Sequence, residues 1–148
     1  MINIKKTFII HRSPFTINMF YTTGYTDKNV ADLPDLLDKL DAVLVDIRFS
    51  PNSRQIVWTK NYLSLLLKKR YQHIPQLGNR AYKEGKIQIQ NLELGIRLIT
   101  ALDYNTVLLC ACKNLNECHR FVVMAELLKR GFEVEELESW KINSPTLF

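Results

Sequence analysis

Five residues near the end of the chain, Cys110, Cys112, Cys118, His119 and Arg120, are of types that carry chemistry. An apolar run typical of a strand leads into this group, and apolar residues at helical spacing follow it. The group is therefore expected at the end of a strand and the start of a helix. A helix N-terminus offers unpaired N–H groups and a positive field, which bind phosphate or carboxylate. Arg120 would add a bidentate contact to such an anion.

The same group offers a nucleophile and a proton carrier. The field of a helix N-terminus lowers the pKa of a nearby thiol, so Cys118 is a candidate nucleophile. His119 could donate a hydrogen bond or act as a general acid. Alternatively, Cys110 and Cys118 are small packing residues. We expect Cys110 to be buried, because it ends an apolar strand.

Two other kinds of cysteine chemistry fit the spacing poorly. A cysteine phosphatase loop needs an arginine six residues after its nucleophile, where this chain has Asn116 after Cys110 and Cys118 after Cys112. A zinc site is disfavoured because the Cys-x-Cys-x₅-Cys-His spacing is no standard knuckle, and adjacent residues on a helix point in different directions. We therefore expect no metal site, and the sequence identifies no cofactor.

A second polar group follows an earlier apolar run, residues 42–47. Asp46 is an acid/base candidate, Arg48 and Arg54 could hold an anion, and Ser50 could orient a substrate. Asp46 could instead simply pair with a neighbouring arginine.

Positive charge is concentrated around this second group. The net charge is +5, and residues 48–91 contain a single acid, Glu84, whereas acidic residues gather on both sides of that stretch. Such asymmetry favours an anionic partner at one surface. The basic residues are Arg48, Arg54, Lys60, Lys68, Lys69, Arg70, Arg80, Lys83 and Lys86.

Strand-like and helix-like segments alternate along the chain. Strands are predicted at 19–24, 42–47, 71–75, 106–111 and 132–137, and helices at 30–40, 58–70, 92–102 and 120–130. Pro34 requires the first helix to start late or after a separate turn. The pattern predicts a single-domain, three-layer α/β/α fold with a mainly parallel sheet of about five strands. The core should span 19–138, between an N-terminal extension, 1–18, and a tail, 139–148, that packs through Trp140 and Phe148.

Ligands of open parallel sheets bind beyond the carboxyl ends of the strands. Besides the two groups above, the first strand leads into Gly24 and Tyr25, and the third leads into Gly78 and Arg80. Four loops thus bring polar, cationic and glycine residues to one edge. Gly24 and Gly78 could also serve turn geometry alone. The convergence predicts a pocket in which Tyr25 orients the ligand and Gly78 belongs to the wall.

Several of these segments resemble the ordered motifs of domain-of-unknown-function family 488. The match covers about residues 20–137. It implies a compact α/β domain, with no agreed activity for the family. The chain departs from the family at Cys112, usually an acid, and at Asn79, often a glycine. The matching segments are 22–26, 45–48 with Pro51, Ser53 and Arg54, 74–78, 109–111 and 118–120.

The leading functional hypothesis is a domain that binds or acts on a phosphorylated small molecule or nucleotide. Arg48, Arg54 and Arg120 would hold the anion. The alternative is a nucleic-acid-binding module that uses the basic segment 48–86 and stacks bases on Trp58, Tyr62, Tyr71 and Tyr82. Against the alternative, Trp58 and Tyr62 fit the core side of a helix, and no recognised nucleic-acid motif is present.

The cellular setting follows from the cysteines and the apolar runs. Three clustered cysteines make a poor disulfide framework and suit a reducing compartment. No apolar run is long enough to cross a bilayer, and the N-terminus has no signal-peptide layout. We therefore expect a cytoplasmic protein with no membrane partner, in an oligomeric state that the sequence does not define.

Overall fold

The computed structural model describes residues 18–141, and in that range it has a five-stranded, all-parallel sheet of order β3-β2-β4-β1-β5. This confirms the predicted α/β fold. The strands are β1 (Phe20–Gly24), β2 (Ala42–Asp46), β3 (Tyr71–His73), β4 (Asn105–Cys110) and β5 (Val134–Glu136). The helices are α2 (Leu33–Leu40), α3 (Lys60–Leu67), α4 (Leu92–Thr100) and α5 (Arg120–Lys129).

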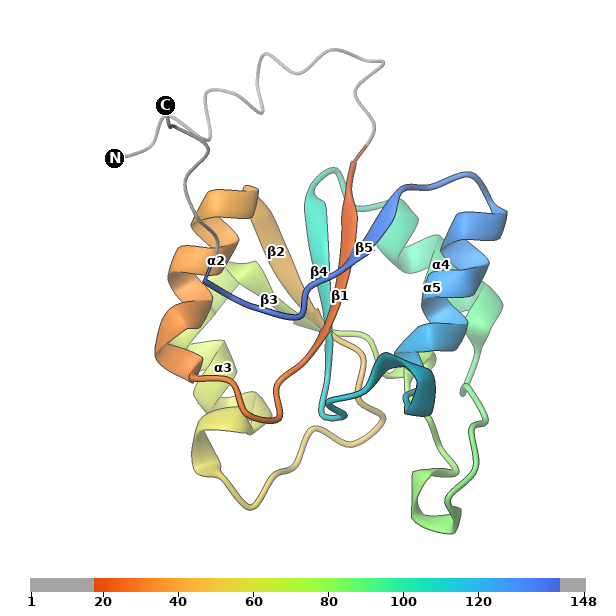
Figure 1. The fold of residues 1–148 in the computed structure, drawn as a ribbon, viewed down its shortest axis with the longest axis horizontal. Helices are drawn as coiled ribbons and strands as arrows, with labels where there is room; N and C mark the ends of the chain where they lie inside the picture. The colour runs from red at the N-terminus through yellow and green to blue at the C-terminus, as the bar shows by residue number, and fades with distance from the viewer. Residues whose placement is uncertain (1–17, 142–148) are drawn as a thin grey trace.

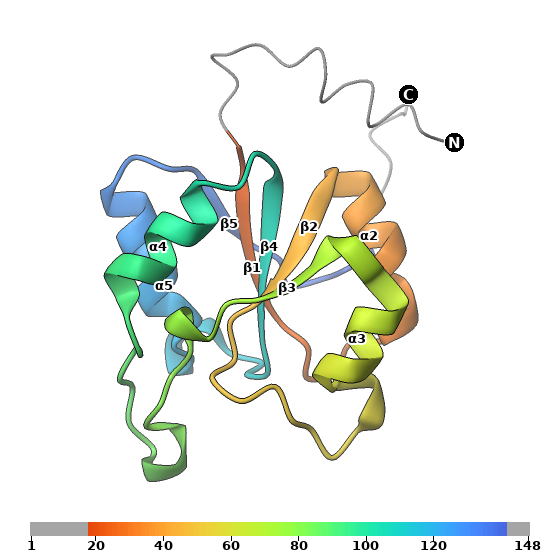
Figure 2. The same cartoon turned by 180° about the vertical axis from the view of Figure 1, so that it is seen from behind.

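The helices cover both faces of the sheet, which gives the three predicted layers. Helices α2 and α3 lie on one face, and α4 and α5 lie on the other (Figures 1 and 2). Successive side chains of β2 point to opposite faces of the sheet, so the strand contributes to the apolar core on each face. Leu44 packs with α2 and α3, whereas Val45 packs with α4 and α5. Because both faces are covered, every residue of β2 is buried.

Pro34 and Gly131 mark the start of one helix and the end of another. Pro34 stands in the first turn of α2, where its missing N–H costs nothing, and a separate 3₁₀ turn at Val30–Asp32 precedes the helix. Gly131 has φ +91° directly after α5, a left-handed conformation that glycine adopts without strain.

Several predicted elements are shorter in the structure, and for α3, β3 and β5 the physical cause is visible. Helix α3 ends at Leu67, because Lys68 has φ 54° and a 3₁₀ turn, Lys68–Arg70, follows. Strand β3 ends at His73, just before Pro75, which cannot donate a ladder hydrogen bond. Strand β5 covers only Val134–Glu136, since it lies at the sheet edge and pairs with β1 alone.

The chain after β5 crosses to the face covered by α2 and α3. Trp140 is buried, its ring meets Trp58 edge-on at 5.7 Å, and its Nε1 donates to Thr23 Oγ1 at 2.9 Å. The predicted packing through Trp140 is thus present. Phe148 lies outside the described residues, as does most of the predicted N-terminal extension. No helix among residues 18–141 has the length and apolar character to cross a membrane.

Gly24 ends β1 where the backbone beyond β4 passes very close. A Cβ at this position would come within 1.6 Å of the Cys112 carbonyl oxygen, which belongs to rigid backbone. We predict that Gly24→Ala lowers the free energy of unfolding by about 2–3 kcal/mol, the usual cost of overpacking. Urea denaturation measures this change.

Gly85→Ala is the matched control. Gly85 has open space around it but a φ of +70°, so an alanine there meets only backbone strain. We expect a cost of about 1 kcal/mol. Equal costs for the two variants would contradict the close approach at Gly24.

Candidate functional site

A cavity of about 370 Å³ opens at the carboxyl edge of the sheet, where the loops after four strands meet. This is the edge at the bottom of Figures 1 and 2. A larger hollow nearby, of about 640 Å³, contains Gly24 as its one predicted site residue. The smaller cavity is therefore the candidate site. Its chemically distinctive wall residues are Tyr25, Arg48, Phe49, Ser50, Tyr82, Lys86, Ile87, Cys112, Glu117 and His119.

Asp46, which does not line this cavity, forms a buried ion pair with Arg48, which does. Arg48 donates through Nε to Asp46 Oδ1 at 2.9 Å and through Nη2 to Oδ2 at 2.6 Å. The backbone N–H of Arg48 and the Tyr71 hydroxyl also donate to this carboxylate, at 3.1 and 2.6 Å. Four hydrogen bonds thus occupy the Asp46 carboxylate, which is fully buried. This suits the pairing alternative better than an acid/base role.

These contacts hold the neighbouring groups in their protonated forms. Burial opposes the charge of Arg48, but the hydrogen bonds and charge of Asp46 outweigh it and raise the pKa of the guanidinium. Burial, and then the charge of Asp46, raise the pKa of the Tyr71 hydroxyl well above its usual range. Arg48 is therefore a permanent cation in the wall.

The Arg48 guanidinium retains donors that can bind a ligand. It has five N–H groups, and two of them bond to Asp46. A third makes a long contact, 3.4 Å, with the hydroxyl of Tyr25, whose ring centre lies 5.2 Å from the guanidinium carbon. Tyr25 is itself stacked on Trp58 at 4.5 Å. Arg48 and Tyr25 are thus fixed in place, and within residues 18–141 the two remaining N–H groups of Arg48 make no hydrogen bond.

His119 lines the cavity in a defined orientation. Its Nε2 lies 2.9 Å from the Ile47 carbonyl oxygen, and because a carbonyl only accepts, Nε2 carries the proton. Burial lowers the pKa of His119, so the ring is neutral near pH 7. Its Nδ1 is then an acceptor, and the Cys118 thiol donates to it over 3.7 Å. A general acid needs a proton that it can release, so this arrangement favours a proton acceptor instead.

The three cysteine sulfurs lie within 4.8 Å of one another, beside the cavity. Cys110 and Cys118 are buried, with their sulfurs 2.7 Å apart, whereas Cys112 is exposed and lines the cavity. The neighbouring Cys110 and Cys118 thiols, and then the charge of Arg120, lower the pKa of Cys112 below its usual range. Burial raises the pKa of Cys110. The thiolate of the cluster is therefore on Cys112, not on the predicted nucleophile Cys118.

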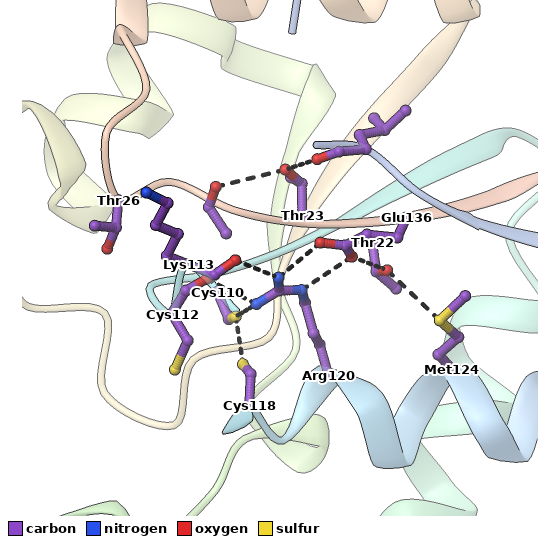
Figure 3. A network of polar contacts seen from close by, with 12 residues as sticks. Thr22, Thr23, Thr26, Cys110, Cys112, Lys113, Cys118, Arg120, Met124 and Glu136 are labelled. Atoms are coloured by element: carbon purple, nitrogen blue, oxygen red, sulfur yellow. Dashed lines mark hydrogen bonds and ion pairs between the residues drawn. The ribbon is translucent and has the colours of Figure 1, made fainter. Parts of the chain in front are cut away.

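Arg120 does not face the cavity. Its side chain is fully buried, and its guanidinium donates to the Glu136 carboxylate at 3.1 and 2.7 Å, to Cys110 Sγ at 3.1 Å, and to the carbonyls of Cys112 and Lys113 at 2.8 and 3.2 Å. All five donors are used, as Figure 3 shows. The predicted anion contact is thus replaced by a structural ion pair, and the carboxylate partner is Glu136 on β5, not Asp46.

Two other predicted pocket residues lie elsewhere. Arg54 is exposed and does not line the cavity, because it follows the bend that starts at Phe49 and points into solvent. Gly78 supports the wall from behind: a Cβ there would come within 2.4 Å of the Phe49 backbone. Of the three predicted arginines only Arg48 lines the cavity, so the site is not arginine-rich.

Sequence reasoning gave Cys112 no role of its own and missed Phe49, Tyr82 and Lys86 as wall residues. Tyr82 and Lys86 lie on the long loop after β3, which folds back so that Asn79 bridges to Ile89. The Asn79 side chain holds this loop in its folded-back path, because it makes hydrogen bonds to the backbone of Lys86, Ala81 and Gln88. The asparagine at position 79 was the available signal in the sequence.

The nucleic-acid alternative loses part of its basis in the structure. Trp58 and Tyr71 are buried and cannot stack on bases, whereas Tyr62 and Tyr82 are exposed. Arg48 is paired with Asp46, and Arg70 with Asp38. The remaining exposed basic side chains are scattered over several elements.

Comparison with protein-family models, with curated proteins and with solved structures finds no match to this chain. The resemblance to family 488 therefore remains a prediction from its motifs.

The Arg120–Glu136 pair leads to a prediction about stability. Arg120→Ala strands a largely buried carboxylate, so we expect the free energy of unfolding to fall by about 3 kcal/mol. Arg130→Ala is the control, since Arg130 pairs with Glu126 and Glu93 at the surface, where ion pairs contribute little, and its loss should cost much less. Thermal and urea denaturation measure both. An Arg120→Ala variant with unchanged stability but weaker anion binding would instead support the predicted anion-binding role of Arg120.

The thiols lead to a prediction about pH. Iodoacetamide should modify Cys112 before Cys110 and Cys118, and the rate should change little from pH 8 to pH 5, because the thiolate persists. An ordinary thiol, with a pKa of about 8.5, slows about tenfold for each pH unit below that value. The protein in urea provides that reference. Peptide mass spectrometry gives the order of labelling, and labelling of Cys118 first would contradict this assignment.

Proposed function

We propose that the cavity binds a small organic molecule with an anionic group, such as a phosphorylated small molecule or a nucleotide. The observation that carries this proposal is the Arg48 guanidinium. It is held by Asp46 in the wall of the cavity, and two of its N–H groups make no hydrogen bond within the part of the chain that the structure describes. A fixed guanidinium binds phosphate or carboxylate without first losing side-chain freedom.

The remainder of the wall suits the organic part of such a ligand. Phe49, Tyr82 and Ile87 provide apolar surface, and Lys86 adds a second cation beside them. The volume lies in the range of small-molecule sites. Glu117 and the Cys112 thiolate also line the cavity and would repel a highly charged ligand. These groups favour a single anionic group near Arg48 over a polyphosphate.

The cellular setting belongs to the same proposal. Free thiols at Cys110, Cys112 and Cys118 persist in a reducing compartment. We propose the cytoplasm as the location, where phosphorylated metabolites and nucleotides are abundant.

Binding is tested by calorimetric titration with adenosine monophosphate, ribose 5-phosphate and inorganic phosphate. We predict that Lys86→Ala weakens binding of the organic phosphates about two- to fivefold, the contribution of an exposed charge. Arg48→Lys keeps the positive charge opposite Asp46 but loses the paired N–H donors of the guanidinium. It should weaken binding about tenfold or more. Lys83→Ala is the matched control, because Lys83 lies on the same loop outside the cavity wall.

Two results would contradict the proposal. One is the absence of binding of all three probes by the folded wild-type protein. The other is an equal effect of Lys83→Ala and Lys86→Ala. A steep loss of affinity with added salt would instead favour many phosphate contacts, as in a nucleic-acid complex.

A further inference from the structure

We infer that Cys110, Cys112 and Cys118 form a dithiol redox centre that reduces a hydroperoxide, with Cys112 as the attacking sulfur and a Cys110–Cys118 disulfide as the product. The inference does not depend on the anion site. It rests on the position of the three sulfurs relative to one another and to the cavity.

The geometry divides the roles among the sulfurs. Cys112 is exposed and lines the cavity, so a small solute can reach it. Cys110 and Cys118 are shielded from solvent, yet both lie within 4.8 Å of the Cys112 sulfur. An accessible thiol with a second thiol behind it is the arrangement of redox-active cysteines. Figure 3 shows the sulfurs of Cys110 and Cys118 facing each other beside Arg120.

The contact between the two buried sulfurs favours bond formation over metal binding. They are 2.7 Å apart, and a disulfide bond is about 2.05 Å long. Two sulfurs that bind one zinc ion tetrahedrally, each at about 2.3 Å, stand roughly 3.8 Å apart. Cys110 and Cys118 are thus already closer than zinc ligands.

The first step oxidises Cys112. Its thiolate attacks the outer oxygen of the hydroperoxide, so an S–O bond forms while the O–O bond breaks. The alcohol leaves after taking a proton from solvent. Cys112 is now a sulfenic acid, two electrons more oxidised, and the peroxide has been reduced by the same two electrons. The lowered pKa of Cys112 supplies the thiolate for this attack near neutral pH.

The second step makes a disulfide. The Cys118 sulfur attacks the Cys112 sulfur, the S–O bond breaks, and the hydroxyl leaves as water with the proton from Cys118. His119 Nδ1, 3.7 Å from Cys118 Sγ, can carry this proton. Cys110 then gives its proton to solvent, which returns the proton taken up in the first step, and its sulfur attacks Cys118. Cys112 leaves as a thiolate, the best leaving group of the three because its pKa is lowest.

The sum is balanced. One hydroperoxide and two thiols give one alcohol, one water and one disulfide. Repeated turnover needs an external dithiol, which reduces Cys110–Cys118 by exchange.

The test treats the reduced full chain with one equivalent of hydrogen peroxide, followed by alkylation and trypsin digestion. We expect a protein that has lost two hydrogens, with peptide 98–113 joined to peptide 114–120 and Cys112 alkylated. Cys112→Ser should slow this oxidation at least about tenfold, because the remaining thiols are buried and protonated. Since Cys112 is exposed, this variant should keep its fold, which circular dichroism checks.

Three further measurements complete the test. In the Cys118→Ser variant, Cys112 should remain a sulfenic acid, which dimedone traps. Dithiothreitol should reduce the oxidised wild-type protein back to its thiols. The wild-type protein unfolded in urea gives the oxidation rate of ordinary thiols. Oxidation of Cys112→Ser at the wild-type rate would overturn the inference. So would a wild-type rate no faster than that in urea, or a chain that binds one zinc ion through these thiols and resists peroxide. Loss of anion binding alone would leave the inference intact, which separates it from the proposed function.

Discussion

The buried guanidinium of Arg120 is the interaction on which the rest of the carboxyl edge depends. From the first residue of α5 it reaches β5 through Glu136, the end of β4 through Cys110 and the following loop through two carbonyls. A cation at a helix N-terminus is unfavourable by itself. Here the Glu136 carboxylate offsets that cost and joins an edge strand to the centre of the sheet. The same contacts fix the direction of the chain at Cys112 and so place its thiol at the cavity.

The two buried arginines of this edge, Arg48 and Arg120, differ in how many of their N–H groups bond to the protein. Both pair with a carboxylate, and in both the pKa is raised against the effect of burial. Arg120 uses every N–H group on the protein, so it has none for a ligand. Arg48 uses two on Asp46 and one weakly on Tyr25. A binding role is therefore open to Arg48 and closed to Arg120, although their residue type and strand-end position suggested the same role.

The fold could be predicted from the sequence because its signals are local. Apolar runs such as 106–111 and helical spacing such as 30–40 are readable within one element, and their alternation determines the layers. The site was predictable only in part. Tyr25, Arg48, Ser50 and His119 do line the cavity. The partner of Arg120 lies sixteen residues away on β5, and the burial of Cys118 depends on packing against Cys110, so neither could be read from spacing.

The strand order has a consequence for how this protein is made. Strand β4 lies between β2 and β1, so both of the first two strands wait for a neighbour that begins at Asn105. During synthesis β1 and β2 leave the ribosome long before β4 does. Until then β2 can pair only with β3, and β1 has no paired strand. Contacts so distant along the chain slow folding, since a long loop must close before they form. A nascent chain that ends before β4 therefore exposes unpaired apolar strand edges, which makes it a substrate for chaperones.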